Sequence, residues 1–304
     1  MREHLIEVHS EQSGMRLDMF ISDFSQKNKL GLSRTFIQGL IKSGKVFLGK
    51  EALIKPHYKV KAGEELRVLI GDDKKEALVP EEIPLEIVYE DEDLAVINKP
   101  CGLVVHPAPG NLEHTLVNAL LHSFKNLSDV NPLRPGIVHR LDKETSGLLV
   151  IAKNNFTHHA LAAQFEKHSI ERTYIALVKG KMEFDENVIE LPIARHPIKR
   201  ENMAVSFKEE ARFAKTHYRT LKRFKEFSML ELKPYTGRTH QLRVHLAFLG
   251  HPILGDKKYG KHNDFMRLAL HAKSLSFLHP RTGKLIGFDS EVPKEFRELI
   301  KKNP

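Results

Sequence analysis

Apolar residues recur at helical spacing near the start of the chain. Residues 17–24 and 36–41 each place Leu, Ile and Phe three or four positions apart, and Ser33 precedes the second segment as a helix-capping residue. Short apolar runs at residues 46–50 and 65–70, bounded by Gly and charged residues, are typical of strands joined by turns. The pattern therefore predicts two short amphipathic helices that pack together, followed by short strands.

Alternating and continuous apolar runs dominate the remainder of the chain. Residues 172–178 alternate as a strand, with Tyr174 on the face opposite to its immediate neighbours. Further strands are predicted at residues 85–88, 94–98, 137–138, 148–151, 268–277 and 285–288. Helices are predicted at residues 156–168 and 293–301. This part of the chain therefore mixes a few helices with many strands.

A polar stretch and a reversal of charge separate the two patterns. Residues 71–84 contain Pro and acidic residues but lack apolar periodicity, which is typical of a linker. Between residues 27 and 61 nine Lys or Arg accompany a single acid, whereas residues 76–93 contain eight acids and no Lys or Arg. We therefore predict a first domain at residues 1–75, a linker at 76–84 and a second domain at 85–304.

Composition indicates an acidic partner. The 304 residues carry a formal net charge of +9, which favours binding to a polyanion such as nucleic acid. No run approaches the roughly 20 apolar residues of a membrane span, and the charged N-terminus does not resemble a signal peptide. The single cysteine, Cys101, cannot form an internal disulfide. We expect no membrane contact and a cytoplasmic location.

Residues 134–153 contain the densest group of candidate reactive side chains. Two apolar runs flank a polar turn that carries His139, Arg140, Asp142 and Glu144. A short charged loop between strands can present catalytic groups at the edge of a cleft, and Asp142 is the leading candidate. The alternative is that Asp142 forms a surface ion pair or an Asx-turn that stabilises the bend. The loop taken alone does not decide between the two.

A family resemblance adds weight to the catalytic interpretation. His139-Arg-Leu-Asp142 followed by Thr145-Ser-Gly-Leu resembles the signature of the RluA/RluD family of pseudouridine synthases, in which the Asp of this motif is the catalytic nucleophile. The resemblance implies that role for Asp142 and RNA contacts for His139 and Arg140. It also implies an α+β catalytic domain with the pseudouridine synthase fold, which has a central, mostly antiparallel mixed sheet and flanking helices.

Two further motifs match the family. One resembles the family's Lys/Arg-x-Tyr-x-Ala motif, whose tyrosine packs against the target base, and this implies that role for Tyr174. Residues 234–245 resemble the segment whose arginine pairs with the catalytic Asp. By position in Gln-Leu-Arg-Val-His, this implies Arg243 as the partner of Asp142, on a neighbouring strand and within about 4 Å of the carboxylate. Arg238 is the second choice.

The N-terminal residues are similar to the S-four-like RNA-binding domain of ribosomal proteins. This small αα-β module precedes the catalytic domain in many RluD-type synthases, and it implies RNA contacts by basic residues such as Arg34 and Lys45. Arg238 is a further candidate for RNA contact from the second domain. The alternative for the module is a plain helical cap with a solvated Lys face. Basic and aromatic residues interleave between residues 195 and 225, which suits single-stranded or splayed RNA.

Neither a metal nor a cofactor is expected. His240, His245 and His251 lack the His-Glu-x-x-His arrangement and have no carboxylates at ligand spacing. Conversion of uridine to pseudouridine breaks the N-glycosidic bond and rejoins the base through carbon, so the resemblance implies a reaction without oxidation or phosphorylation. Whether Asp142 attacks the sugar, attacks the base or takes the proton from carbon 2′ stays open.

The sequence therefore predicts an RNA pseudouridine synthase, working as a monomer. The N-terminal module and a run over residues 195–205 that is similar to RluD favour large-subunit (23S) ribosomal RNA, or a pre-ribosomal particle, as the partner. The alternatives are the same reaction on tRNA, a glycosidase-like hydrolase that uses Asp142 and Glu144, and a non-catalytic RNA-binding ribosome-assembly factor. The last of these would explain the charge but not the polar loop matched to Tyr174 and Arg243.

Overall fold

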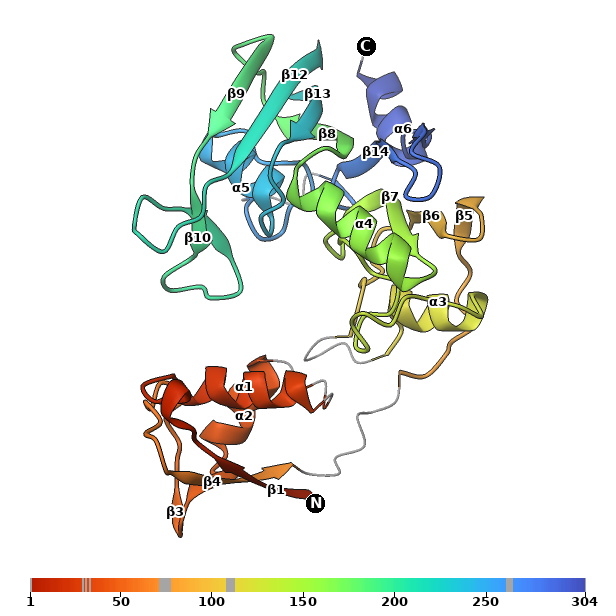
Figure 1. The fold of residues 1–304 in the computed structure, drawn as a ribbon. Coiled ribbons are helices and arrows are strands. Elements are labelled where there is room, and N and C mark those ends of the chain that lie inside the picture. Colours follow the sequence, from red (N-terminus) through yellow and green to blue (C-terminus); the bar gives the residue numbers. More distant parts are fainter. Residues whose placement is uncertain are drawn as a thin grey trace. The chain divides into compact units, whose positions relative to one another are not determined.

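The chain forms two compact units, residues 1–77 and 78–304 (Figure 1). The structure is a computed structural model that describes residues 2–28, 30, 32, 34–70, 78–107, 113–260 and 265–303. The predicted cap Ser33 and residues 71–77 of the predicted linker lie outside the described residues. In the described part of the chain, no helix combines the length and the apolar character that crossing a bilayer requires.

The first unit packs two helices against a small antiparallel sheet. Its elements are β1 (Arg2–Glu7), the 3-10 helix η1 (Ser10–Gln12), α1 (Leu17–Lys27), α2 (Arg34–Lys42), β2 (Val46–Leu48), β3 (Glu51–Ala52) and β4 (Glu65–Ile70). The strand order is β1-β4-β2-β3. Phe20, Ile41 and Val68 are buried in one core that joins both helices to the sheet. The predicted helices and strands are confirmed, and β1 is an additional strand that pairs with β4.

The second unit is built on one large sheet. In the described residues its strands are β5 (Glu86–Glu90), β6 (Leu94–Lys99), β7 (Ser146–Ala152), β8 (Glu171–Lys179), β9 (Glu186–Glu190), β12 (Lys215–Arg223), β13 (Phe227–Pro234), β14 (Leu270–Leu278) and β15 (Leu285–Asp289). The order is β5-β6-β7-β14-β8-β13-β12-β9, and β15 pairs with β14. Only β7 and β14 run parallel among these pairs, so the predicted mostly antiparallel mixed sheet is confirmed.

Helices cover both faces of this sheet. The helices of the second unit are α3 (Leu116–Ser123), α4 (Asn155–Glu166), α5 (Gln241–Phe248) and α6 (Lys294–Lys302). Leu148 and Val150 of β7 pack in a cluster with Leu161 of α4. The alternate residues Leu149 and Ile151 pack in the larger cluster that includes side chains of α3, α5 and α6. Burial on both faces explains why β7 is a continuous apolar run.

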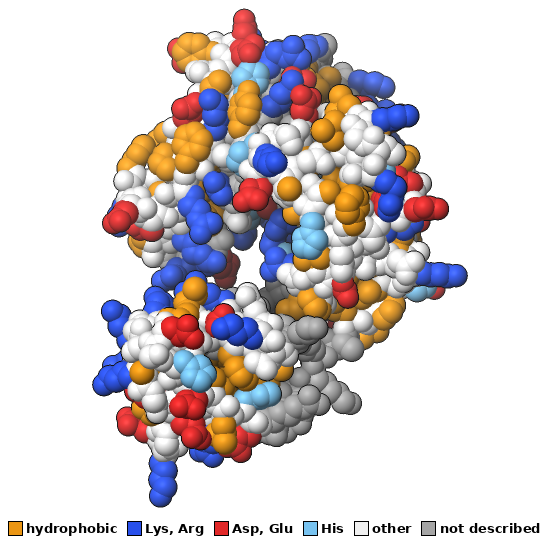
Figure 2. Space-filling view, viewed as in Figure 1, with side chains coloured by type: hydrophobic (Ala, Val, Ile, Leu, Met, Phe, Trp, Pro, Cys, Tyr) orange, Lys and Arg blue, Asp and Glu red, His pale blue; other side chains and the backbone are white. Residues whose placement is uncertain are grey.

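A short hairpin stands apart from the large sheet. It consists of β10 (Ile193–Arg195) and β11 (Met203–Val205), which pair only with each other among the described strands. Ile198 at its turn is 85% exposed, and the adjacent Lys199 and Arg200 are also exposed. On the face of the molecule in Figure 2, Lys and Arg side chains gather around this region.

Two predicted strands differ from the structure. Residues 137–138 form no strand, and only an isolated bridge joins Ile137 to Ile151. The segment that carries Arg243 is the helix α5 and not a strand. Leu242, Val244 and Leu246 occur at every second position, which is the period of a strand. In the structure all of residues 241–246 are buried, so this helix has no single apolar face, and the sequence lacks the pattern by which an amphipathic helix is predicted.

Candidate active site

Asp142 lies in a cleft of about 120 Å³ in the second unit, in the turn just before β7. The residues lining the cleft come from the turn itself, from β8 and from the segment that leads into α5. The Asp142 side chain is 21% exposed, so the carboxylate can be reached from solvent while most of it is surrounded by protein. The turn closes on itself through a hydrogen bond from the Thr145 N–H to the Asp142 carbonyl.

A buried lysine, Lys99, holds the backbone of the turn that carries Asp142. The Lys99 ammonium donates to the carbonyl oxygens of Pro100, Leu103 and Lys143, at 2.9, 2.9 and 3.1 Å. The Gly102 N–H donates to the same Lys143 carbonyl. Burial lowers the pKa of Lys99 to about 8. Because Lys143 directly follows Asp142, these bonds fix the backbone beside the candidate nucleophile.

A glycine allows the turn to enter the sheet. Gly147 has φ +112, and a Cβ atom there would lie 2.2 Å from the carbonyl oxygen of Ala272 on β14. Only glycine fits this close approach of two parallel strands without a shift of the backbone. The position of β7, and hence of the Asp142 turn, therefore depends on Gly147.

Arg243 pairs with two carboxylates at once. Its Nη1 donates to Asp142 Oδ2 at 3.4 Å, so the predicted approach within 4 Å is confirmed. Its Nε and Nη2 donate to Asp256 Oδ2 and Oδ1, each at 2.8 Å. The stronger, two-pronged pair is therefore with Asp256. Burial would lower the pKa of Arg243, but the bonds that it donates to Asp256, and the charge of that carboxylate, outweigh burial and raise the pKa.

His240 faces the same carboxylate from the start of α5. Its Nε2 lies 4.0 Å from Asp142 Oδ2, and its Nδ1 lies 2.7 Å from the hydroxyl of Tyr259. Burial lowers the pKa of His240 to about 4, against the opposing charge of Asp142. The imidazole is therefore neutral at pH 7, with one ring nitrogen as donor and the other as acceptor.

Tyr174 lies on β8 and lines the cleft, with 9% of its surface exposed. Burial raises the pKa of its phenol, so the ring carries a neutral hydroxyl at pH 7. The structure therefore brings Asp142, Tyr174 and Arg243 to one cleft. Their roles as nucleophile, base-packing residue and ionic partner stay predictions.

The residues predicted to contact RNA fall into different settings. Arg140 and Arg238 both line the cleft, where Arg140 Nη1 lies 3.5 Å from His106 Nε2 and Arg238 Nε donates to the Phe213 carbonyl. Arg34 is half exposed and pairs with the buried Asp18 at 3.0 Å. Arg140 and Arg238 therefore line the same cleft as Asp142, whereas Arg34 belongs to the first unit, and their contacts with RNA stay predictions.

His139 and Lys45, the other two residues predicted to contact RNA, do not line the cleft. His139 Nε2 accepts the Val150 N–H at 3.1 Å, its ring stacks on Phe165, and burial lowers its pKa to about 3. These contacts favour a role for His139 in holding the turn against β7 and α4 rather than in binding RNA. Lys45 lies between α2 and β2 of the first unit, and its backbone bonds to Leu40 and Leu69.

Sequence reasoning assigned no role to Asp256 and considered His240 only as a metal ligand. Asp256 lies thirteen residues beyond Arg243, and this separation gives no sign of pairing. A buried acid near a buried arginine is recognised only once the loop after α5 is seen to fold back. Both residues therefore had to be found in the structure.

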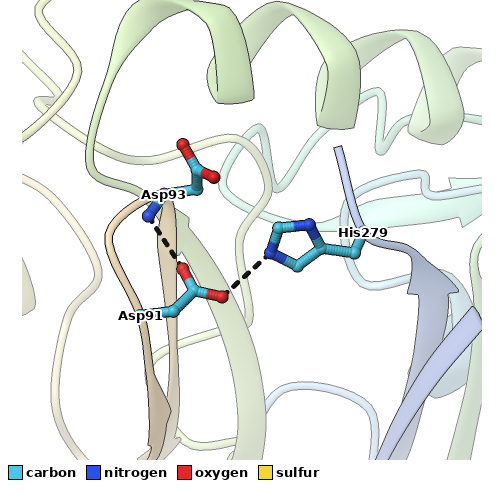
Figure 3. A group of neighbouring side chains, drawn as sticks. All are labelled: Asp91, Asp93 and His279. Carbon is cyan, nitrogen blue, oxygen red and sulfur yellow. Dashed lines mark hydrogen bonds and ion pairs between the residues drawn. The ribbon is translucent and has the colours of Figure 1, made fainter. Parts of the chain in front are cut away.

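In the described residues, one group has the spacing to hold a metal ion, and it lies away from the cleft. Asp91, Asp93 and His279 approach one another between the β5–β6 turn and the end of β14 (Figure 3). Asp91 Oδ2 accepts from His279 Nε2, while the Asp93 carboxylate points away from Asp91 and binds Arg281. Asn154 adds a further bond to Asp93. The two carboxylates therefore have protein partners, and their ion pairs connect the β5–β6 turn to the segment after β14.

Comparison with known proteins identifies the family. A family model described as RNA pseudouridylate synthase matches residues 93–248. The chain belongs to this family. The match contains Asp142, Tyr174 and Arg243 but ends before Asp256. The protein is therefore an RNA pseudouridine synthase, an isomerase that acts on uridine in RNA.

Relatives of this pseudouridine synthase match along nearly their whole length. A protein of Aquifex aeolicus named "Uncharacterized RNA pseudouridine synthase" is 42% identical, with 97% of this chain and 96% of the relative covered. A protein of Zymomonas mobilis named "Ribosomal large subunit pseudouridine synthase D" is 43% identical, with the same coverage. Among solved structures, "Human RNA Pseudouridylate Synthase Domain Containing 1" is similar with a TM-score of 0.57 and 25% identity, covering 72% of this chain and 94% of that one.

Proposed function

We propose that this synthase isomerises specific uridines in the RNA of the large ribosomal subunit, with Asp142 as the nucleophile. The observation that carries the proposal is the ion pair between Asp142 and Arg243 inside a cleft that Tyr174 also lines. The Arg243 guanidinium orients the carboxylate in the cleft through a charge-assisted bond, and the carboxylate is the nucleophilic group. The names of the relatives from Zymomonas mobilis and Pasteurella multocida, both large-subunit synthases, support the choice of RNA.

Each cleft residue has a part in the proposed reaction. The target nucleotide leaves its stack and enters the cleft, where Tyr174 packs against the uracil. Asp142 attacks the nucleotide, the bond between carbon 1′ and nitrogen 1 breaks, and the held uracil turns and joins carbon 1′ through carbon 5. The bond to Asp142 then breaks, carbon 5 loses its proton, and nitrogen 1 gains one, so that product and substrate are isomers and the carboxylate is free again. Arg140, two residues from Asp142, fills the space left by the flipped base or binds a phosphate.

The basic surfaces supply affinity for the RNA around the target. The first unit, with Arg34 and Lys45, and the hairpin of β10 and β11 would contact the phosphate backbone. A precursor of the large subunit in the cytoplasm would present such an RNA. We therefore propose that the chain, as a monomer, acts on ribosomal RNA or a pre-ribosomal particle.

The hydrolase alternative has less support. A hydrolase of this kind requires a second catalytic carboxylate of the protein beside the substrate. Glu144 is not among the residues that line the Asp142 cleft. The Glu144 carbonyl instead accepts a bond from the Cys101 thiol. Asp256, the carboxylate that shares the partner Arg243 with Asp142, accepts two bonds from that arginine.

The test compares wild-type protein with Asp142→Asn on large-subunit ribosomal RNA transcripts and on tRNA transcripts. Nucleoside analysis distinguishes pseudouridine from free uracil, and a binding assay measures RNA affinity. We expect pseudouridine in ribosomal RNA from wild type, and no turnover from Asp142→Asn with affinity unchanged or slightly higher because one negative charge is removed. Near wild-type turnover by a folded Asp142→Asn would refute the nucleophile, since Asn can serve an Asx-turn. Free uracil would favour a hydrolase, and product only in tRNA would refute the ribosomal substrate.

A further inference from the structure

The loop after α5 contacts Arg243, the ionic partner of Asp142, through Asp256 and Tyr259. Asp256, on this loop, is buried, and its carboxylate accepts both the bonds from Arg243 and two backbone bonds, from the N–H groups of Lys258 and Tyr259. The Asp256 side chain therefore both stabilises its own turn and holds the Arg243 guanidinium. The Arg243 side chain, which is 5% exposed, has little freedom to leave Asp256.

The hydroxyl of Tyr259 is the second support. Its oxygen accepts the Met203 N–H at 2.9 Å and lies 2.7 Å from His240 Nδ1. The Tyr259 ring also faces the Arg243 guanidinium, with 5.2 Å between the guanidinium carbon and the ring centroid. With the Met203 bond occupying a lone pair, the hydroxyl proton is free to donate to Nδ1. When the hydroxyl donates in this way, the proton of the neutral imidazole lies on Nε2, the nitrogen facing Asp142.

Arg243 and His240 both approach the same oxygen of Asp142. Arg243 Nη1 and His240 Nε2 lie 3.4 and 4.0 Å from Oδ2, whereas the structure gives Oδ1 no hydrogen bond with any described residue. The Arg243 bond therefore restrains Oδ2, and the neutral His240, at 4.0 Å, faces that oxygen from beyond hydrogen-bond distance. The arrangement therefore distinguishes two chemically identical atoms.

We propose that Asp256 and Tyr259 are positioning residues that act through Arg243 and His240 to hold Oδ2 of Asp142 and leave Oδ1 for attack. The inference rests on the proposed role of Asp142 as nucleophile. Neither supporting residue needs to touch the RNA. Loss of either should therefore slow the chemical step while leaving RNA binding unchanged.

Asp256→Asn tests the first support. The variant keeps an oxygen for the turn at Lys258 and Tyr259, but its amide group places a donor against the donors of Arg243. We expect the single-turnover rate of pseudouridine formation to fall roughly 10- to 100-fold, because a charge-assisted bond is replaced by a repulsive contact. The RNA dissociation constant should stay within about twofold. Asp93→Asn is the control, because it alters the ion pair of another buried Asp with an arginine, the exposed Arg281, away from the cleft.

Tyr259→Phe tests the second support, and it removes one hydroxyl while the ring over Arg243 is kept. We expect a fall of roughly 3- to 10-fold in the single-turnover rate. Tyr89→Phe, which removes a hydroxyl that binds Asp91, is the control and should keep the wild-type rate.

A double-mutant cycle separates positioning from general stability. His240→Asn suits the backbone, because His240 has φ +56 and Asn tolerates this conformation well. If Tyr259 acts through His240, adding Tyr259→Phe to His240→Asn should change the rate by less than about twofold. A merely structural Tyr259 would lower the rate by the same factor in both backgrounds.

The results can separate this inference from the proposed function. Asp142→Asn without activity, together with wild-type rates for Asp256→Asn and Tyr259→Phe, would overturn the inference and leave the function standing. Equal losses in the control variants, or full additivity in the cycle, would also overturn it. An active Asp142→Asn would instead remove the function on which the inference rests.

Discussion

Lys99→Met should change how the stability of the protein depends on pH. Lys99 is fully buried, and its ammonium donates to three backbone carbonyls. Met has a similar shape but neither a charge nor a donor. The Lys143 carbonyl keeps its bond from Gly102 in the variant, so the carbonyls of Pro100 and Leu103 are the acceptors left without this partner.

Two opposing effects set the stability near pH 7. Two orphaned carbonyls cost about 2–6 kcal/mol together, at about 1–3 kcal/mol each. Burial lowers the pKa of Lys99 from 10.5 to about 8, and at about 1.4 kcal/mol per pKa unit the buried charge costs about 3 kcal/mol. Met removes this cost. The two effects partly cancel, so Lys99→Met changes the stability at pH 7 by between about 1 kcal/mol of stabilisation and about 3 kcal/mol of destabilisation.

The pH dependence is the sharper measurement. Between pH 8 and 10.5 the unfolded chain keeps the Lys99 proton while the folded chain has lost it, so the stability of the wild type rises with pH. The Met variant lacks this contribution. The free energy of unfolding of wild type minus that of Lys99→Met should therefore increase by about 3 kcal/mol from pH 7 to pH 10.5.

Urea unfolding followed by far-UV circular dichroism, at intervals from pH 7 to 10.5, measures this difference. The chain contains no Trp, so circular dichroism is preferable to fluorescence. Other titrating groups cancel in the subtraction, because both proteins contain them. A difference that stays constant across this range would refute the assignment of a buried, charged Lys99 and of its anchoring role.

Three further predictions follow from other parts of the chain. In thermal unfolding, Gly147→Ala should destabilise the protein by more than about 3 kcal/mol, because its Cβ would overlap the Ala272 backbone. The control Gly14→Ala, whose Cβ meets nothing within 4 Å, should cost about 1 kcal/mol, and equal losses for the two variants would contradict the reasoning. Burial lowers the pKa of His271 to about 4, so its contribution to stability is complete above pH 6.5 and is lost as the pH falls toward 4; His271→Gln should flatten the melting temperature between these pH values, and an unchanged slope would contradict this. Deleting residues 1–75 should weaken RNA binding and its salt dependence while the circular dichroism of the remaining unit persists; unchanged affinity would mean that the basic residues serve solubility only.

The sequence by itself determined most elements of the fold. Strands such as β8 and helices such as α4 follow from local periodicity, because each buries a face of its own residues wherever the neighbours lie. The family motif was equally local. Asp142 could be singled out because His139-Arg-Leu-Asp142 is contiguous, and the pairing with Arg243 came from a second contiguous motif.

Only the tertiary structure decided the remainder of the site. The helix α5 is buried on all sides, so its period was hidden and Arg243 was placed on a strand. Asp256, His240 and Lys99 act through contacts between segments that are far apart in sequence or through backbone carbonyls, which no residue pattern encodes. Hydrogen bonds of this kind depend on where the chain folds back, and that is set by the packing of the whole second unit.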